Sequence, residues 1–176
     1  LLQKLSQKYD YRLVNASVLR HKEKVVSSTQ IRKCLQKGNL NLANILLSRT
    51  WSIEGLVQKG KRLGKKLGYP TCNINVKNYV LPKIGIYTVK VLINGSNRIF
   101  NGVAYLGYRP TFAGKDVVLE VNIFGIKKNL YGRKLIVYFL KFIRGEQKFK
   151  NSFSLIRQMK KDVIFAKKSL KTKLVL

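Results

Sequence analysis

The sequence is poor in acidic residues, cysteine and histidine, and each shortage excludes a class of protein. Of its 176 residues only seven are Asp or Glu, two are Cys and one is His. Two cysteines and one histidine make neither a disulfide framework nor a complete zinc site. No apolar run approaches the roughly 18 residues that a membrane span needs, and the apolar start is too short for a signal peptide. The expected location is therefore a reducing cytoplasm.

Positive charge, by contrast, is abundant. Lysine and arginine number 36, which gives a formal net charge of +29. Such a charge is typical of proteins that bind nucleic acid or another anionic surface. Here lysine far outnumbers arginine, asparagine and isoleucine are common, and the basic residues are spread along the whole chain. This pattern favours compositional drift, with an anionic small-molecule substrate, over a selected basic stripe. Functional polyanion binding stays open as the alternative.

The first 50 residues are predicted to be helical. In SSTQIRKCLQKGNLNLANILL, apolar side chains recur at helical spacing on both sides of a glycine. Ser27, Ser28 and Thr29 lie where the first of these helices would begin. Hydroxyl side chains at such a position usually cap the helix, although a helix N-terminus can also hold a phosphate group.

From Trp51 onward, short runs rich in β-branched and aromatic residues predict strands. The runs are 51–58, 84–93, 98–107, 116–124 and 134–143. An Asn-Gly-Ser sequence after Ile93 indicates a hairpin, and apolar residues return at helical spacing after a cap at Asn151 or Ser152. We therefore predict a mainly β fold, a small antiparallel, Greek-key-like, six-stranded barrel with a C-terminal helix. A short helical segment precedes it, which divides the chain into residues 1–50 and 51–176.

The segment GLVQKGKRLGKKLGYPTCNI places Gly60, Gly64 and Gly68 four residues apart, with five basic side chains around them. Glycines at this spacing let backbone N–H groups turn toward a phosphate, and the hydroxyl of Thr71 could reach a Mg²⁺ ion. The pattern matches neither the Walker loop nor the dinucleotide fingerprint. A phosphate loop and a plain basic loop therefore both stay open, and residues 70–73 are expected to form a turn.

Glu120 is interpreted as the only carboxylate inside an apolar strand, VVLEVNIF. Strict alternation places it on one face with Val118 and Asn122, and the apolar residues between them on the other. The face that holds Glu120 could be a solvated outer surface. Alternatively it opens on a barrel mouth or interior, where the carboxylate could accept a proton from a hydroxyl group.

Taken together, these segments resemble the riboflavin kinases. The glycine segment is similar to the family signature that ends in PTAN, LPKIGIYTVKV to its LP-x-x-GVY strand, and NGVAYLGYRPTF to its GVxNIGxRPTF segment. The stretch from LEVNIF to GEQKF resembles the family's EVH and FIRxExKF blocks. The similarity runs in order from about Trp51 to Ala166. Before it, VSSTQIRKCLQKGNLNLANILLSR resembles the end of the FMN adenylyltransferase domain of bacterial bifunctional FAD synthetases.

The resemblance implies phosphoryl transfer from Mg²⁺–ATP to the 5′-hydroxyl of riboflavin, with FMN and ADP as products. The residues implied in ATP binding belong to the glycine segment: Gly60, Gly64, Lys65, Gly68 and Thr71. Thr71 and Asn73 would hold Mg²⁺, and Glu120, assisted by Asn73, would act as the general base. Weaker candidates for flavin binding, from an aromatic-lined slot, are Tyr131, Arg144 and Phe149.

The front of the chain carries a second set of implied residues. Those that match the adenylyltransferase SSTxIR sequence are Ser27, Ser28, Thr29 and Arg32. The HxGH nucleotide motif of that domain is absent, so this chain alone is not expected to make FAD. We interpret residues 1–50 as the tail of an adenylyltransferase domain.

Three of the departures from the family pattern bear on the site. Cys72 replaces the usual Ala, a change expected to be harmless. Asn122 replaces the common His, which should leave catalysis intact. Gly125 replaces an Asp or Asn, so any contact of that side chain would be lost.

The alternative function is a basic β-barrel that binds nucleic acid without catalysis. It would need clustered basic residues with exposed aromatic side chains between them, whereas the lysines here are dispersed. Riboflavin and ATP are therefore the expected partners. No membrane and no specific nucleic acid are expected, non-specific polyanion binding stays open, and the sequence does not fix the oligomeric state.

Overall fold

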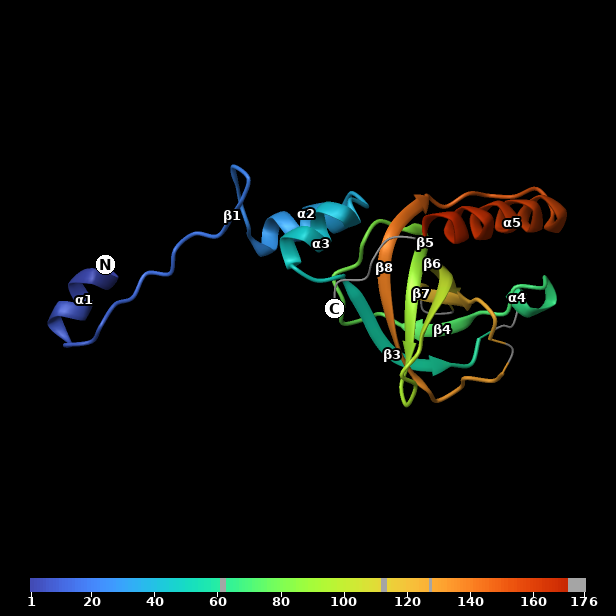
Figure 1. The fold of residues 1–176 in the computed structure, drawn as a ribbon, viewed down its shortest axis with the longest axis horizontal. Coiled ribbons are helices and arrows are strands. Elements are labelled where there is room, and N and C mark those ends of the chain that lie inside the picture. The colour runs from blue at the N-terminus through green and yellow to red at the C-terminus, as the bar shows by residue number, and fades with distance from the viewer. Residues whose placement is uncertain (61–62, 112–113, 127, 171–176) are drawn as a thin grey trace.

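The protein is described by a computed structural model that covers residues 1–60, 63–111, 114–126 and 128–170. Its body is a closed barrel in which neighbouring strands follow the order β3-β4-β7-β6-β5-β8 (Figure 1). The strands are β3 (Ser52–Gln58), β4 (Cys72–Asn75), β5 (Gly85–Ile93), β6 (Ile99–Thr111), β7 (Gly114–Ile123) and β8 (Lys134–Arg144). All neighbouring pairs are antiparallel. The predicted six-stranded barrel is confirmed.

Alternating side chains fill the barrel. On β7, Leu119 and Val121 are fully buried and Ile123 nearly so, while Glu120 and Asn122 lie on the other face. On β5, Tyr87 packs edge-to-face against Phe139 of β8 with ring centroids 5.0 Å apart. Burying each such large apolar side chain contributes about 1.5–3 kcal/mol. The predicted alternation is therefore correct, and Glu120 lies outside the barrel rather than in its interior.

The strand β4 corrects the expected turn at residues 70–73. Cys72 and Asn73 are opposite Val121 and Glu120 of β7, and β4 also pairs with β3. The segment is polar and short, and it is extended because both neighbouring strands supply hydrogen-bond partners for its backbone. Glu54 requires a second correction, because it also lies inside a strand, β3, where it forms an ion pair with Lys134.

The first 50 residues are helical only in part. They form α1 (Leu2–Lys8), α2 (Ser28–Gln36) and α3 (Leu40–Leu47). Between α1 and α2 the chain is extended, with a two-residue hairpin of β1 (Arg20–His21) and β2 (Lys24–Val25). The prediction was wrong for this stretch because its apolar residues form no periodic stripe that a helix could bury. Val14, Val18 and Leu19 are exposed there.

The helix pair α2–α3 packs on the barrel and shares its core. Asn44 of α3 donates through Nδ2 to the carbonyl of Phe139 at 3.2 Å and accepts from the backbone N–H of Trp51 at 2.8 Å. Lys83 donates its backbone N–H to the carbonyl of Leu35 at 2.9 Å. The buried side chains of both helices belong to the same cluster as those of the barrel. The division at residue 50 stays a prediction, but the core does not break there.

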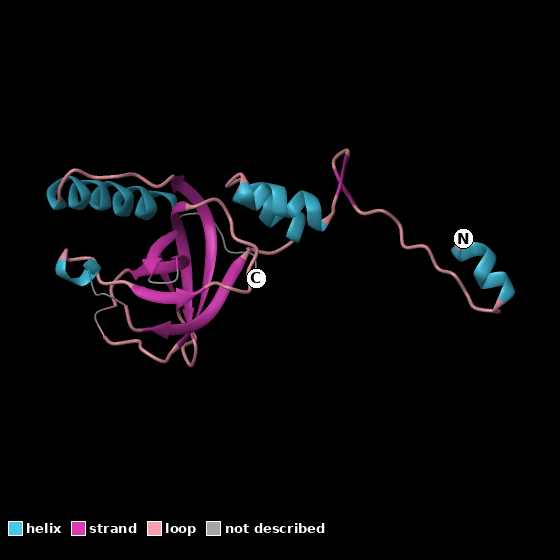
Figure 2. Ribbon diagram, turned by 180° about the vertical axis from the view of Figure 1, so that it is seen from behind, coloured by secondary structure: helices cyan, strands magenta, loops and turns pink. Residues whose placement is uncertain are grey.

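Two further helices lie on the other side of the barrel (Figure 2). The short α4 (Leu63–Lys66) follows β3, and α5 (Ser152–Ser169) follows β8. The predicted cap of α5 is correct, since Asn151 Oδ1 accepts from the Ser154 N–H at 2.9 Å. None of the helices in the described ranges is long and apolar enough to cross a membrane.

Candidate functional site

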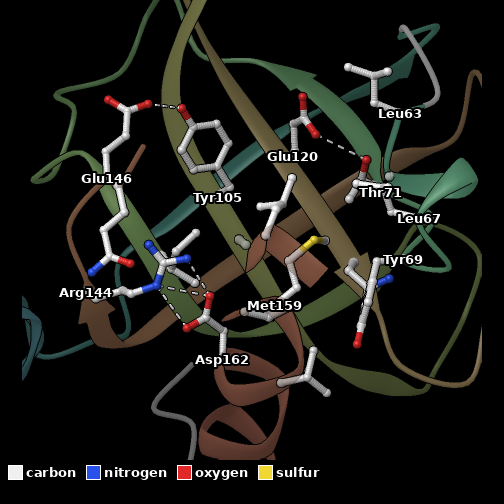
Figure 3. Close-up of a pocket in the computed structure, with 18 of the residues that line it drawn as sticks. Leu63, Leu67, Tyr69, Thr71, Tyr105, Glu120, Arg144, Glu146, Met159 and Asp162 are labelled. Atoms are coloured by element: carbon white, nitrogen blue, oxygen red, sulfur yellow. Dashed lines mark hydrogen bonds and ion pairs between the residues drawn. The ribbon is translucent and has the colours of Figure 1, made fainter. Parts of the chain in front are cut away.

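A pocket of about 390 Å³ lies on the outer face of the barrel, beneath α5 (Figure 3). The barrel contributes Tyr105 and Glu120 to it, and α5 contributes Met159. The α4 segment, which comprises residues 63–70, contributes Leu63 and Leu67. Most of the lining is apolar, and its polar groups are concentrated in a few pairs. An outward-facing strand surface thus becomes a cleft because a helix covers it.

A row of polar side chains crosses the outer face of the barrel beside this pocket, from β4 through β7 to β6. Directly opposed residues of antiparallel strands share a face, so the pairing of Asn73 with Glu120, and of Glu120 with Tyr105, aligns all three. Thr71 precedes Asn73 by two residues and joins the same face. Its Oγ1 donates to Glu120 Oε2 at 3.3 Å. A hydroxyl, an amide and a carboxylate therefore meet where β4 pairs with β7.

Two glycines of the regular series let the α4 segment lie against this row. A Cβ on Gly60 would fall 2.3 Å from Asn73 Nδ2, and a Cβ on Gly64 would fall 2.4 Å from the Tyr69 carbonyl and 3.2 Å from Thr71 Oγ1. Any side chain there would force the segment away from the Thr–Asn pair. The spacing of four therefore has a packing reason, and the turning of backbone amides toward a phosphate stays a prediction.

A second pocket, of about 450 Å³, opens on the other side of Thr71. Lys65 and Lys128 supply positive charge to it, and Tyr131 supplies an aromatic ring. Cys72 also lines it, and burial raises the pKa of this thiol to about 11. The thiol is therefore protonated at neutral pH and is a poor nucleophile. Thr71 lines both pockets.

The far side of the first pocket is formed by two polar pairs (Figure 3). Arg144 Nε donates to both carboxylate oxygens of Asp162 at 3.0 and 3.1 Å, and its Nη2 donates to Oδ2 at 2.7 Å. The Tyr105 hydroxyl donates to Glu146. Burial, followed by that hydrogen bond and the nearby negative charges, raises the pKa of Tyr105 well above its ordinary value, so the phenol keeps its proton.

Comparison with known proteins gives the family of this chain. The family model described as riboflavin kinase matches residues 47–170. This chain belongs to the riboflavin kinase family. It is 44% identical over 142 residues to the bifunctional riboflavin kinase/FMN adenylyltransferase of Haemophilus influenzae, covering 81% of this chain and 46% of that protein. It is 38% identical over 148 residues to the protein of the same name from Bacillus subtilis, covering 82% and 46%. The chain thus spans about half the length of the curated relatives it matches.

Solved structures give the same fold. A crystal structure described as a macrolide-efflux protein from Streptococcus pneumoniae superposes with a TM-score of 0.81 at 30% identity, covering 94% of this chain and 54% of that one. A riboflavin kinase from Trypanosoma brucei superposes with a TM-score of 0.50 at 20% identity, covering 70% of this chain and 82% of that one. The second likeness shows the fold alone.

The structure brings some predicted site residues of this riboflavin kinase family member together and separates others. Those that line the pocket beneath α5 are Gly64, Thr71, Glu120, Arg144 and Phe149. Tyr131 lies in the second pocket with Lys65, away from Arg144 and Phe149, because it belongs to the β7–β8 connection beyond the end of β7. Of the described residues, Gly60, Gly68 and Asn73 line neither pocket.

The four residues predicted as an adenylyltransferase remnant are elsewhere. Ser27 caps α2, accepting from the Gln30 N–H at 3.2 Å, and Ser28, Thr29 and Arg32 are exposed on the same helix. In Figure 1, α2 lies on the side of the barrel opposite α4. They take no part in either pocket.

Asp162, Tyr105 and Glu146 were missed as site residues by reasoning from sequence. Asp162 carries a signal in hindsight, since it is the one acid on α5 and recurs at helical spacing with the apolar residues that face the barrel. Glu146 carries another, because it lies in the GEQKF stretch that resembles the family's FIRxExKF block, whereas Tyr105 carries none that would pair it with Glu146. They are 41 residues apart and meet only because of the barrel register.

The structure shows the surroundings of two residues that depart from the family pattern. Gly125 has φ of +77° in the turn after β7. Gly, Asn and Asp are the residues that adopt this conformation most readily, so the position requires a backbone conformation that all three tolerate. Asn122 donates from Nδ2 to the carbonyl of Pro70 at 2.7 Å. The side chain at position 122 therefore contacts the residue before Thr71. The expectation that replacing His here leaves catalysis intact stays a prediction.

Proposed function

We propose that this chain transfers the γ-phosphoryl group of ATP to the 5′-hydroxyl of riboflavin, giving FMN and ADP. The observation that carries the proposal is the position of Thr71. It lies between two pockets and hydrogen-bonds to Glu120, the carboxylate nearest to that junction. A phosphoryl transfer needs two substrates to meet at one point, and family membership supports these two substrates.

We assign the flavin to the pocket beneath α5 and the ATP phosphates to the second pocket. The first has a predominantly apolar lining, with Met159 and Phe149 beside paired polar groups, which suits a flat, weakly polar ring system. The second contains Lys65 and Lys128, whose ammonium groups suit phosphate oxygens. Thr71 and Glu120 then lie where the ribityl chain and the γ-phosphate would meet.

Glu120 takes the role of general base. Its carboxylate accepts the proton of the 5′-hydroxyl as that oxygen forms a bond to the γ-phosphorus, and the bond from phosphorus to the β–γ bridging oxygen breaks to release ADP. The Thr71 hydroxyl orients the carboxylate through its hydrogen bond. Fixed positions and charge neutralisation supply most of the rate enhancement in such reactions.

The residues at the junction also fit a Mg²⁺ ion delivered with ATP. Thr71, Asn73 and Glu120 offer only oxygen ligands, the type that Mg²⁺ prefers. Within the described ranges, no three His, Cys, Asp or Glu side chains cluster as a full metal cage would need. Mg²⁺ commonly binds through one or two protein oxygens and substrate phosphates. When bound, the ion would neutralise charge on the phosphates.

The alternative, a barrel that binds nucleic acid without catalysis, lacks a comparable observation. Several lysines lie over aromatic rings, such as Lys141 over Phe165 at 5.3 Å and Lys167 over Phe124 at 5.5 Å. These rings are therefore occupied by the protein's own cations rather than presented for base stacking. Weak, salt-dependent polyanion binding is what the net charge alone supports.

The test is ADP release with riboflavin present or omitted, together with chromatography of the flavin. We expect ADP formation to depend on riboflavin and to equal FMN formation mole for mole. ADP release at the same rate with and without riboflavin would show that the protein is an ATPase instead. A complete absence of FMN after prolonged incubation would refute the proposal.

A further inference from the structure

Asn122 makes a contact that the phosphoryl-transfer chemistry above does not use. It is half-buried on the outer face of β7, two residues beyond Glu120, and its side chain also lines the pocket beneath α5. Its Nδ2 donates to the backbone carbonyl of Pro70 at 2.7 Å. Pro70 lies immediately before Thr71 and outside β4, where the pairing of β4 with β7 has already ended at Cys72 and Val121.

The contact matters because it joins the residue before Thr71 to the barrel at a point that the strand pairing in the described residues does not reach. Proline has no N–H to donate, and the strand ladder does not reach it. The preceding residues bond within the α4 segment, as in the Tyr69 N–H donating to the Gly64 carbonyl at 2.8 Å. Among the described residues, these hydrogen bonds close that segment on itself.

Glu120 and Asn122 together attach this segment to one strand at two consecutive points. Glu120 accepts from the Thr71 hydroxyl, and Asn122 donates to the carbonyl one residue earlier. Both side chains project from the same face of β7 because strand residues two apart share a face. A two-point attachment fixes the rotation of Thr71 as well as its distance, which one hydrogen bond would not.

The attachment of Pro70 and Thr71 to β7 also positions the residues around Gly64. The segment lies so close that a Cβ on Gly64 would be 3.2 Å from Thr71 Oγ1. Lys65, the next residue, lines the second pocket. Whatever holds Pro70 and Thr71 on β7 therefore also sets where the glycine segment lies beside both pockets.

We propose that Asn122 is a positioning residue, which holds the glycine segment against β7 so that Thr71 keeps its place beside Glu120 and Lys65 keeps its place in the second pocket. The kinetic part of this inference rests on the proposed kinase function, whereas the attachment of the glycine segment to β7 by Asn122 does not. The side chain needs an N–H donor for the task and no charge. A histidine at this position would keep a donor, whereas a leucine would keep the approximate size and lose it.

The experiment compares Asn122→Leu with Asn122→His, and with Asn101→Leu as a control. Asn101 is an exposed asparagine on the neighbouring strand β6 and lies outside both pockets. The first measurement, limited trypsin digestion, needs no substrate. Mass spectrometry measures the rate of cleavage after Lys65 and Lys66, and cleavage after Lys160 on α5 is the internal reference. We expect Asn122→Leu to speed cleavage in the glycine segment about fivefold, the ratio that follows from losing one such hydrogen bond. Cleavage after Lys160 should be unchanged.

The second measurement is steady-state kinetics with ATP and riboflavin varied. We expect Asn122→Leu to lower kcat and raise the KM for ATP, a combined loss of about fivefold to tenfold in kcat/KM for ATP. Asn122→His should restore most of the loss, and Asn101→Leu should match the parent.

Parental cleavage in the glycine segment of Asn122→Leu would overturn the proposal. So would faster cleavage at every site with a lower melting temperature, because the asparagine would then serve the whole fold. If the parent makes no FMN, the proposed function fails and the positioning role fails with it. The trypsin measurement would then still decide whether Asn122 holds the segment.

Discussion

Replacing Glu120 by glutamine separates proton acceptance from the other contacts of this side chain. Glutamine has nearly the same size and keeps a carbonyl oxygen that can accept from the Thr71 hydroxyl, which in the parent donates to Oε2 at 3.3 Å. It cannot act as a base near neutral pH. The variant therefore tests the assigned chemistry with little change in geometry.

The expected effects of Glu120→Gln on turnover and on stability follow from the surroundings of this side chain. Glu120 is half-buried on the outer face of β7, and its neighbours Leu119 and Val121 carry the packing of that strand. Substitutions at such positions usually alter the free energy of unfolding by about 0.5 kcal/mol or less. Loss of a general base lowers turnover by about 10²- to 10⁴-fold. A fall of that size with an unchanged melting temperature is what we expect.

The assay is ADP release at saturating riboflavin, with ATP affinity measured separately by equilibrium binding. Glu54→Gln is the matched control, because Glu54 also lies inside a barrel strand but pairs with Lys134 away from both pockets. Glu120→Gln should bind ATP with nearly parental affinity, whereas Thr71→Ala should lose affinity as well as turnover. Near-parental turnover of Glu120→Gln would refute the role of this carboxylate as a base.

Three further outcomes follow from other contacts. Gly64→Ala should weaken ATP binding without unfolding the barrel, because the new Cβ would meet the Tyr69 carbonyl at 2.4 Å; equal ATP affinity would contradict this. Asp162→Ala should reduce the free energy of unfolding in urea by about 3 kcal/mol, since it leaves Arg144 without its partner in a well-shielded ion pair; an unchanged midpoint would contradict it. Alkylation of Cys72, followed by mass spectrometry, should keep accelerating from pH 8 to pH 10, since its pKa is about 11 and the thiolate is the reactive form; a plateau near pH 9 would show an ordinary thiol.

Five of the six barrel strands could be predicted because each combines alternation with β-branched or aromatic residues, as in the run that became β5. The strand β4 could not, because Cys72–Asn75 is short and polar and becomes a strand through its partners. Local propensity cannot report a partner that lies some 45 residues away in the sequence, as β7 does.

The candidate site was predictable where it depended on a strand's own alternation, and not where it depended on how the barrel closes. Placing Glu120 and Asn122 on one face needed only a period of two. Grouping Tyr131 with Arg144 needed the relation between the connection that precedes β8 and the opposite end of β8, and the structure separates them into different pockets. The pairing of Arg144 with Asp162 depended on which face of α5 packs on the barrel.

The same alternation that builds the core of the barrel also determines which side chains face the site on its outer surface. If β7 slipped by one residue against its neighbours, Glu120 would enter the apolar interior and Leu119 would be expelled to the pocket face. Burying an unpaired carboxylate and exposing a leucine are both unfavourable, so the register that gives the barrel its stability also fixes which residues face Thr71. The helix α5 then turns this exact outer surface into a pocket, and its hold on β8 through Asp162 and Arg144 keeps it there. Stability and site geometry are thus coupled through strand register, and substitutions that merely shrink core side chains should lower stability well before they displace Glu120 from Thr71.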